Sequence, residues 1–95
     1  MKYIYYLTTG EKVEIIATKP LSLDFLQLLV AGRIEGQVLS DGTYIFFNEE
    51  GLLDHLPVNP FFEEDNPLVS HLRTEGGIKG NVIQGKLENS DFVGL

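Results

Sequence analysis

The fold is decided by one stretch of sequence, Tyr44-Ile45-Phe46-Phe47-Asn48-Glu49-Glu50-Gly51, and by the Leu56-Pro57-Val58-Asn59 that closes the loop after it. The four consecutive apolar residues 44–47 indicate a strand buried in the core. A buried strand that runs directly into a polar segment places that segment on a rigid scaffold, where functional loops are common. The segment 48–59 is therefore the first candidate for a functional loop.

Working outward from this strand, residues 33–48 are predicted to form a hairpin around Asp41-Gly42, the strongest turn signal in the chain. A two-residue turn there pairs Val38 with Ile45 and gives one wholly apolar face. That core face comprises Ile34, Val38, Ile45 and Phe47. The other face mixes polar with aromatic side chains, among them Arg33, Tyr44 and Phe46. It is a candidate oligomer interface or binding surface, the alternative being that the loop at 60–75 covers it.

Residues 2–17 are predicted to form a second hairpin, with Thr9-Gly10 as a two-residue loop. In that register one face is uniformly apolar and should face the core. It comprises Ile4, Tyr6, Val13 and Ile15. Tyr3 and Tyr5 then lie on the opposite face, where they extend the mixed aromatic face if the two hairpins join in one sheet.

Residues 22–31 are predicted to form the main helix, with Ser22 as N-cap, Asp24 in the first turn and Gly32 as the residue after the C-cap. The stripe that should face the core is Leu21, Phe25, Leu28 and Leu29. The apolar arc is wide, which favours a helix packed against a sheet. A membrane-surface helix would carry Lys and Arg on its polar face, and this segment has neither.

The predicted fold class is α+β, a twisted antiparallel sheet of about five strands with one principal helix packed on one face. Residues 1–95 are expected to form a single domain. Residues 81–87 supply the last long strand, and Phe92-Val93 adds a short final pairing. In the looser segment 60–75, Phe61 and Phe62 are expected to anchor the chain, and residues 68–72 are a candidate short helix.

Composition narrows the function classes. The net charge of −7 and the scattered basic residues disfavour direct nucleic-acid binding, and leave solubility or a basic partner as explanations of the charge. The absence of cysteine excludes disulfides, thiolate zinc sites and cysteine nucleophiles. No apolar run is long enough for a signal peptide or a membrane span, so a cytoplasmic protein without membrane contact is expected.

One family pattern runs through the chain. Leu26-Gln27-Leu28-Leu29-Val30-Ala31-Gly32-Arg33-Ile34-Glu35 resembles L-Q-x-L-V-G-G-x-I-E of the family called domain of unknown function 3846. The family continues with a D-G or similar turn, an apolar strand and N-E-E-G-x-x-x-x-L-P-x-N, to which residues 41–59 are similar. A late D-x-I-x-G element resembles residues 81–85. Ala31 replaces the usual first glycine and Asn81 a common acidic residue. The resemblance covers residues 12 to 95 and implies a small protein of phages and bacterial mobile elements, a family with no established activity.

The loop pattern supports two interpretations. In the structural one, Gly51 permits a positive φ, Pro57 stiffens the loop, Leu56 fills the core, and Asn48 and Asn59 bond to loop backbone. In the functional one, side chains of this loop contact a ligand directly. The candidate binding residues are Arg33, Tyr44, Phe46, Asn48, Glu49, Glu50, His55 and Asn59.

Catalytic and metal chemistry find little support in the sequence. His55 and His71 lie far apart and lack the helical i, i+4 spacing of a metal site. The carboxylates at 49–50 and 63–65 lack the alternating spacing of a calcium loop and are better explained as a solvated acidic rim. We therefore expect no catalytic residue, no metal and no cofactor.

Three functions are compared on this basis. The first is a small non-enzymatic binding protein that acts through a host protein partner. The second is sequestration of a small molecule, for example a nucleotide signal, near Arg33, the 48–59 loop and Lys79 at an interface of a homo-oligomer. The third, an enzyme, is the least supported, because a conventional active site is hard to build in 95 residues without cysteine or a histidine pair.

Overall fold

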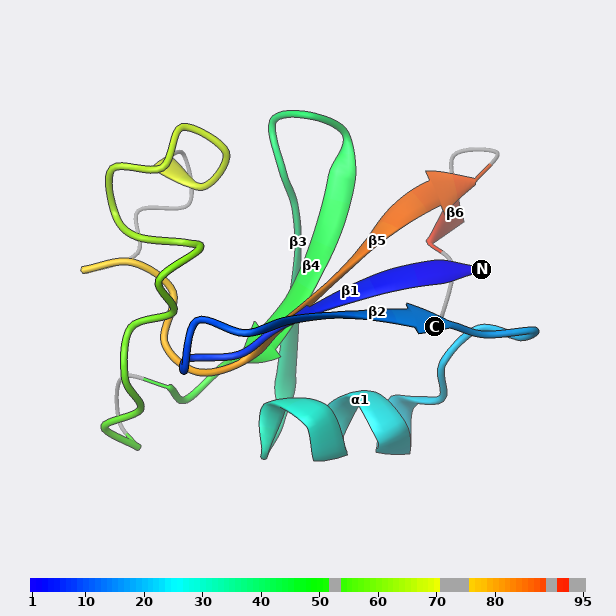
Figure 1. Ribbon diagram of the computed structural model, residues 1–95, viewed down its shortest axis with the longest axis horizontal. Helices are drawn as coiled ribbons and strands as arrows, with labels where there is room; N and C mark the ends of the chain where they lie inside the picture. Colours follow the sequence, from blue (N-terminus) through cyan, green and yellow to red (C-terminus); the bar gives the residue numbers. More distant parts are fainter. Residues whose placement is uncertain (52–53, 71–75, 89–90, 93–95) are drawn as a thin grey trace.

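The computed structural model describes residues 1–51, 54–70, 76–88 and 91–92. Its elements, in chain order, are β1 (Lys2–Tyr6), β2 (Lys12–Ile16), α1 (Leu23–Val30), β3 (Ile34–Val38), β4 (Thr43–Asn48), β5 (Val82–Glu88) and β6 (Asp91–Phe92). Five strands form an antiparallel sheet in the order β2-β1-β5-β4-β3, and β6 pairs with β5. Figure 1 shows the strongly twisted sheet with α1 along one side of it. The predicted α+β fold is therefore confirmed.

The strand β4, which lies between β5 and β3, is buried on both of its faces. Tyr44 and Phe46 point toward α1, where they form one core cluster together with Tyr3, Leu26 and Ile83. On the opposite face, a second core cluster comprises Leu39, Ile45, Phe47, Phe62, Val69, Ile78 and Val82. This second cluster is covered by residues 58–70 and 76–80, the described parts of the segment that we call the 58–80 loop. Burial on both faces explains why residues 44–47 are continuously apolar.

The anchoring role predicted for the two phenylalanines of this loop is confirmed. Phe62 is 2% exposed, and Phe61 packs at the edge of the same cluster. Both rings lie against Tyr6, with centroid separations of 4.9 Å. Residues 71–72 of the candidate short helix and Val93 of the candidate final pairing lie outside the described residues. Phe92 does pair, as part of β6.

The first hairpin is shifted by one residue from its predicted register. Its turn is one residue longer, because the Leu7 N–H donates to the carbonyl of Glu11 (2.9 Å) and Gly10 adopts a φ of 93°. A three-residue loop ending in a left-handed glycine is common in hairpins. The extra residue shifts β1 by one position against β2, so the side chains of β1 that face the core are the opposite set from the predicted one. Tyr3 is therefore in the core at 1% exposure. Ile4 and Tyr6 do not share a face with Val13 and Ile15, which pair with Tyr5 and Tyr3 instead. The predicted core face of Ile4, Tyr6, Val13 and Ile15 is therefore wrong.

The second hairpin differs from its prediction in the same way. Its turn also contains three residues and ends at Gly42, which has a φ of 87°. Val38 consequently pairs with Tyr44 and not with Ile45. Tyr44 and Phe46 then lie beneath α1, at 0% and 1% exposure. The prediction that these two residues line an exposed binding surface or oligomer interface is wrong, because the helix covers that face.

Ser22 caps α1 as predicted, since its Oγ accepts a hydrogen bond from the Phe25 N–H (3.2 Å). The stripe beneath the helix differs from the prediction. Leu26 and Val30 face the sheet at 0% and 1% exposure, whereas Phe25 and Leu28 are 39% and 73% exposed. The helix is apolar around most of its circumference, so periodicity alone does not identify the side that is buried.

The C-terminal end of α1 is closed by a left-handed residue, which is Ala31 (φ 62°) and not the predicted Gly32. The Gly32 N–H donates to the Gln27 carbonyl (3.0 Å) and the Ala31 N–H to the Leu28 carbonyl (3.3 Å), which is the Schellman pattern. Gly32 is required for a different reason. A Cβ at this position would lie 2.7 Å from Nδ2 of Asn48.

Replacing Ala31 by glycine should stabilise the protein. The left-handed conformation costs a non-glycine residue about 1–2 kcal/mol, which exceeds the roughly 0.4–1 kcal/mol that the added freedom of glycine gives the unfolded chain. We expect Ala31→Gly to raise the free energy of unfolding by roughly 0.5–1 kcal/mol in urea denaturation. The matched variant Gly32→Ala should lower it, because Asn48 would have to move. An Ala31→Gly protein no more stable than the original would contradict the left-handed cap.

The carboxylate of Asp41 should titrate at an unusually low pH. It accepts hydrogen bonds from Oγ (2.6 Å) and N–H (2.9 Å) of Thr43, and these lower the pKa of Asp41 from its ordinary value of 3.8. Because the folded pKa is the lower one, the stabilisation is present above the unfolded pKa and is lost as the pH falls through the folded pKa. Thr43→Val should raise the Asp41 pKa toward 3.8, measured by carboxyl-carbon NMR titration. Thr9→Val, in the other turn, should leave it unchanged.

Candidate functional site

Asn48, the last residue of β4, ties the start of the 48–59 loop to the end of α1. Its side chain is buried, and Nδ2 donates to the carbonyls of Val30 and Ala31 at 3.4 Å each. Its Oδ1 accepts a hydrogen bond from the Glu50 N–H (2.8 Å). The last carbonyls of a helix have no partner within the helix, so this amide satisfies them while it turns the chain out of the sheet. Its hydrogen bonds give Asn48 a structural role.

Asn59, at the other end of the loop, joins three segments of the chain. It is 0% exposed. Its Nδ2 donates to the carbonyls of Tyr6 (3.1 Å) and Gly80 (3.0 Å), and its Oδ1 accepts from the Phe61 N–H (3.0 Å). The end of β1, the segment before β5 and the 58–80 loop are thus held by one buried amide. This side chain does not reach the surface where a ligand would bind.

The loop between these two asparagines also differs in backbone from the prediction. Gly51 does not have a positive φ, whereas the exposed His55 has a left-handed φ of 55°. Gly51 is needed for close packing instead, since a Cβ there would lie 2.9 Å from the Cβ of Lys79. Lys79 itself directs its ammonium to the carbonyl of Gly77 (2.9 Å). Leu56 is half-buried beside Gly80.

Arg33, Glu49 and Glu50 are the predicted site residues that the fold brings together at the surface. Arg33 Nε lies 2.9 Å from Oε1 of Glu49, and Nη1 lies 3.6 Å from Oε1 of Glu50. The Glu49 N–H also donates to the Arg33 carbonyl (3.0 Å). This hydrogen bond holds the backbone segments before β3 and after β4 side by side. The Arg33 side chain is 75% exposed, so these ion pairs contribute at most about 1 kcal/mol to stability. The cluster is accessible to a partner, and Arg33 offsets the charge of one of the two carboxylates.

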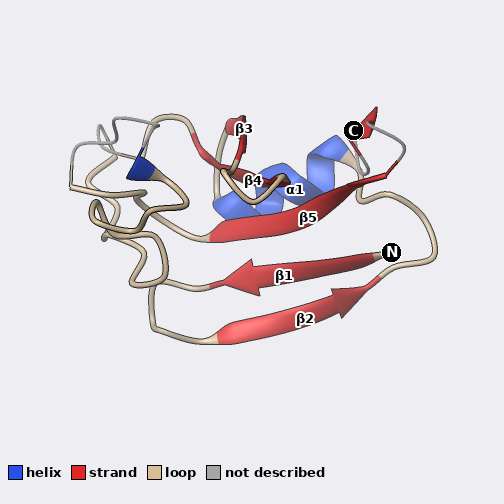
Figure 2. Cartoon of the chain, turned by 90° about the horizontal axis from the view of Figure 1, so that it is seen from above, coloured by secondary structure: helices blue, strands red, loops and turns tan. Residues whose placement is uncertain are grey.

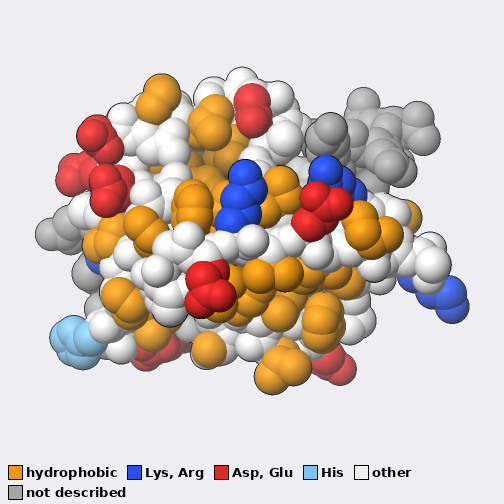
Figure 3. Space-filling view, in the orientation of Figure 1, with side chains coloured by type: hydrophobic (Ala, Val, Ile, Leu, Met, Phe, Trp, Pro, Cys, Tyr) orange, Lys and Arg blue, Asp and Glu red, His pale blue; other side chains and the backbone are white. Residues whose placement is uncertain are grey.

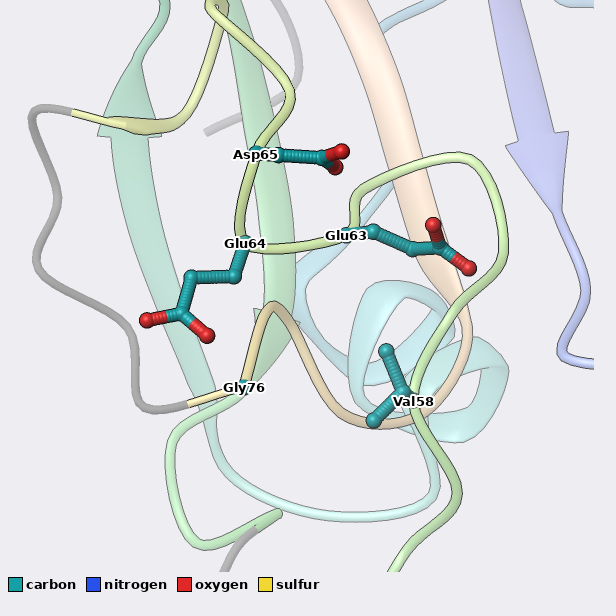
Figure 4. Close-up of a pocket in the computed structure, with 5 residues that line it drawn as sticks. All are labelled: Val58, Glu63, Glu64, Asp65 and Gly76. Carbon is teal, nitrogen blue, oxygen red and sulfur yellow. The ribbon is translucent and has the colours of Figure 1, made fainter.

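A shallow hollow of about 500 Å³ lies on the outer side of the 58–80 loop, lined by Val58, Glu63, Glu64, Asp65 and Gly76. Figure 4 shows Glu64 pointing to the opposite side of the backbone from Glu63 and Asp65, so the three carboxylates do not converge. Among the described residues, no group of three His, Cys, Asp or Glu side chains is placed to hold a metal ion. The negative lining opposes a phosphate-rich ligand, because like charges repel.

A further surface, which we call the apolar surface, was missed by the sequence-based prediction. It consists of Val13 on β2 and of Phe25 and Leu28 on α1, which are 44%, 39% and 73% exposed. Ile15 and Leu29, on the same two elements, are half-buried and pack against the core cluster beneath α1. Figure 3 shows hydrophobic side chains gathered along the junction between β2 and α1.

The position of α1 over the sheet creates this surface. The helix packs on β3, β4 and β5, so it leaves the helix-side face of β2 uncovered. Leu29 marks the flank of α1 that faces β1 and β2, because its carbonyl accepts a hydrogen bond from the Tyr5 hydroxyl (2.6 Å). Phe25 lies one turn before Leu29 on the same flank, and Leu28 lies beside both. Phe25 and Leu28 of the predicted stripe are therefore exposed instead of lying beneath the helix.

One signal in the sequence could have indicated this surface. Six of the eight residues of α1 are apolar, Leu23, Phe25, Leu26, Leu28, Leu29 and Val30. A helix of this length cannot bury apolar side chains on every side against a single sheet. Some of them must remain exposed, although only the structure shows which.

Removal of the Asn59 amide should destabilise the fold strongly. Asn59→Ala removes the hydrogen bonds that the amide makes to the Tyr6 and Gly80 carbonyls and to the Phe61 N–H, and each buried group left unsatisfied costs about 1–3 kcal/mol. We expect a loss of roughly 3 kcal/mol or more in urea denaturation. Asn66→Ala is the matched control, because Asn66 is only half-buried and makes two local hydrogen bonds. Equal losses for the two variants would show that Asn59 has no special role.

The comparisons with known proteins concern the whole chain. No helix among the described residues is long and apolar enough to cross a membrane. The chain matches no curated protein and no solved structure. The family model described as Domain of unknown function (DUF3846) matches residues 1–95, which extends the resemblance seen in residues 12–95 to the entire sequence. The chain therefore belongs to the DUF3846 family.

Proposed function

We propose that this chain is a non-enzymatic binding protein that acts through a protein partner, and that the partner docks on the apolar surface. The observation that supports this most is the exposure of Val13 on β2 and of Phe25 and Leu28 on α1, together with the hydrophobic side chains gathered along the junction of these two elements in Figure 3. Single exposed apolar side chains are ordinary, but adjacent ones from two elements are typical of interaction sites. Phe25 supplies an aromatic side chain of the kind that is enriched at the centre of protein interfaces.

The shape of this surface favours a protein over a small molecule. Sites for small ligands are concave and enclose most of the ligand, whereas the apolar surface lies on the flank of a helix and the adjoining strand. The net charge of −7 favours a partner with basic residues around an apolar patch, since a negative surface attracts such a partner over a distance. The phage and mobile-element setting that the family resemblance implies makes a host protein, met in the cytoplasm, the partner that we propose.

Leu28→Glu should weaken partner binding without unfolding the chain. Leu28 is 73% exposed, so the change should alter stability by about 0.5 kcal/mol or less. The matched control is Leu23→Glu, which has the same charge change on the same helix at a residue 51% exposed. Leu23 follows Ser22 and does not share the flank of Phe25 and Leu28.

The three proteins are used in parallel as baits in host lysate. A partner in the proposed sense is retained by the original chain and by Leu23→Glu, and its dissociation constant rises at least about tenfold with Leu28→Glu. Equal retention of every captured protein by all three baits would contradict the proposal. Native mass spectrometry of the purified chain tests the sequestration alternative, because a retained small molecule would appear as a discrete added mass.

A further inference from the structure

The outer edge of β2 is free in the part of the chain that the structure describes. β2 stands at one end of the strand order and pairs with β1 alone. Figure 2 shows β2 at the margin of the sheet, with β1 on its inner side. A free strand edge presents a row of unpaired N–H and C=O groups, which favours pairing with another strand.

The backbone groups that point outward are those of Lys12, Glu14 and Ile16. In an antiparallel pair, alternate residues direct their N–H and C=O groups toward the neighbouring strand. Ala17 and Met1 bond to each other through both their backbone groups, and Leu7 bonds to Glu11. Odd-numbered residues of β2 therefore bond to β1, and even-numbered ones face outward.

We infer that β2 pairs antiparallel with β2 of a second copy of this chain, around a two-fold axis at Val13. Lys12 of each copy then lies opposite Glu14 of the other, and these residues exchange backbone hydrogen bonds across the axis. Opposite charges directly across an antiparallel pair are stabilising. The inference goes beyond the proposed function, because it depends on the strand edge and not on the apolar surface.

Charge selects this register over its neighbours. An axis at Glu14 or at Lys12 would place like charges directly opposite each other, which is destabilising. An axis at Ile15 would place Glu14 opposite Ile16 and leave the charge without a counterpart. The axis at Val13 is the one that pairs each Lys12 with a Glu14. It also places the two Val13 side chains in a non-hydrogen-bonded pair, where side chains approach most closely.

The charged side chains are already held on the required face of the sheet. Lys12 and Glu14 point away from α1, because Val13 and Ile15 point toward it. The Lys2 ammonium lies 3.2 Å from the Glu14 carboxylate, and the Lys12 ammonium lies 5.7 Å from the centre of the Tyr6 ring. In the dimer, Glu14 would lie between Lys2 of its own chain and Lys12 of the other copy.

The pairing joins the apolar surfaces of the two copies instead of covering them. Val13 stands at the axis, so the exposed parts of β2 become one continuous sheet face with a helix on each side. The contact itself is one pair of short strands, smaller than a standard stable interface. The dimer should therefore be weak and should dissociate on dilution.

The test is a charge-reversal cycle followed by sedimentation equilibrium over a wide range of concentrations. Lys12→Glu and Glu14→Lys should each weaken the dimer about tenfold, since each makes both cross-strand pairs repulsive. The double variant Lys12→Glu with Glu14→Lys restores the pairs and should restore the dissociation constant. If the net charge of each copy controlled the dimer instead, the two single variants would shift the dissociation constant in opposite directions. Lys12→Glu raises the net negative charge, whereas Glu14→Lys lowers it.

A backbone variant tests the same edge independently. The Glu14 N–H faces outward, so Glu14→Pro should preserve the pairing of β2 with β1 and abolish the dimer. Leu28→Glu should leave the dimer unchanged, which separates this inference from the proposed function. A chain that stays monomeric at every concentration would overturn the inference, as would a dimer indifferent to the charge-reversal cycle. If Glu14→Pro does not fold, the charge-reversal cycle decides.

Discussion

Burial of β4 on both faces is the constraint on which the rest of this structure depends. Its side chains project alternately to the two sides of the sheet, and all four from Tyr44 to Phe47 are buried. Each side of the sheet must therefore be covered. The short helix α1 covers one side, and the described residues of the 58–80 loop cover the other. The backbone groups of a covering loop need hydrogen-bond partners of their own. The buried Asn59 amide supplies three hydrogen bonds there, to the Tyr6 and Gly80 carbonyls and from the Phe61 N–H.

Several residues of the family pattern hold the fold together. Asn48, Gly51 and Asn59 belong to the matching segment, and all three act inside the molecule. Gly32 serves the same end, because it leaves room for the Asn48 side chain. These four residues of the pattern thus support the scaffold. The side chains that we propose to meet a partner are ordinary apolar residues outside the N-E-E-G and L-P-x-N segments, so related chains could keep the scaffold and differ in their partners.

The sequence predicted the elements of this fold well and their register poorly. The strands, the Ser22 cap and the fold class follow from local patterns of apolar residues and turn residues. Both registers failed for the same reason, because Gly10 and Gly42 were placed inside two-residue turns although each is the third residue of a longer one. Of the predicted site, the meeting of Arg33 with Glu49 and Glu50 appears only once β3 and β4 are paired. The apolar surface depends on where α1 lies across the sheet, which local patterns do not specify.

The place of β5 in the sheet has a consequence for synthesis of the protein. β5 lies between β1 and β4, yet it follows both hairpins in the chain by more than thirty residues, from Asn48 to Val82. On the ribosome, the two hairpins can form early, but each has an inner edge that waits for a strand not yet made. Contacts so distant in sequence form slowly, and unpaired edges expose a nascent chain to misassembly. The sheet therefore cannot be completed until β5 has been made, and a chain truncated before β5 would lack the strand that joins its two halves.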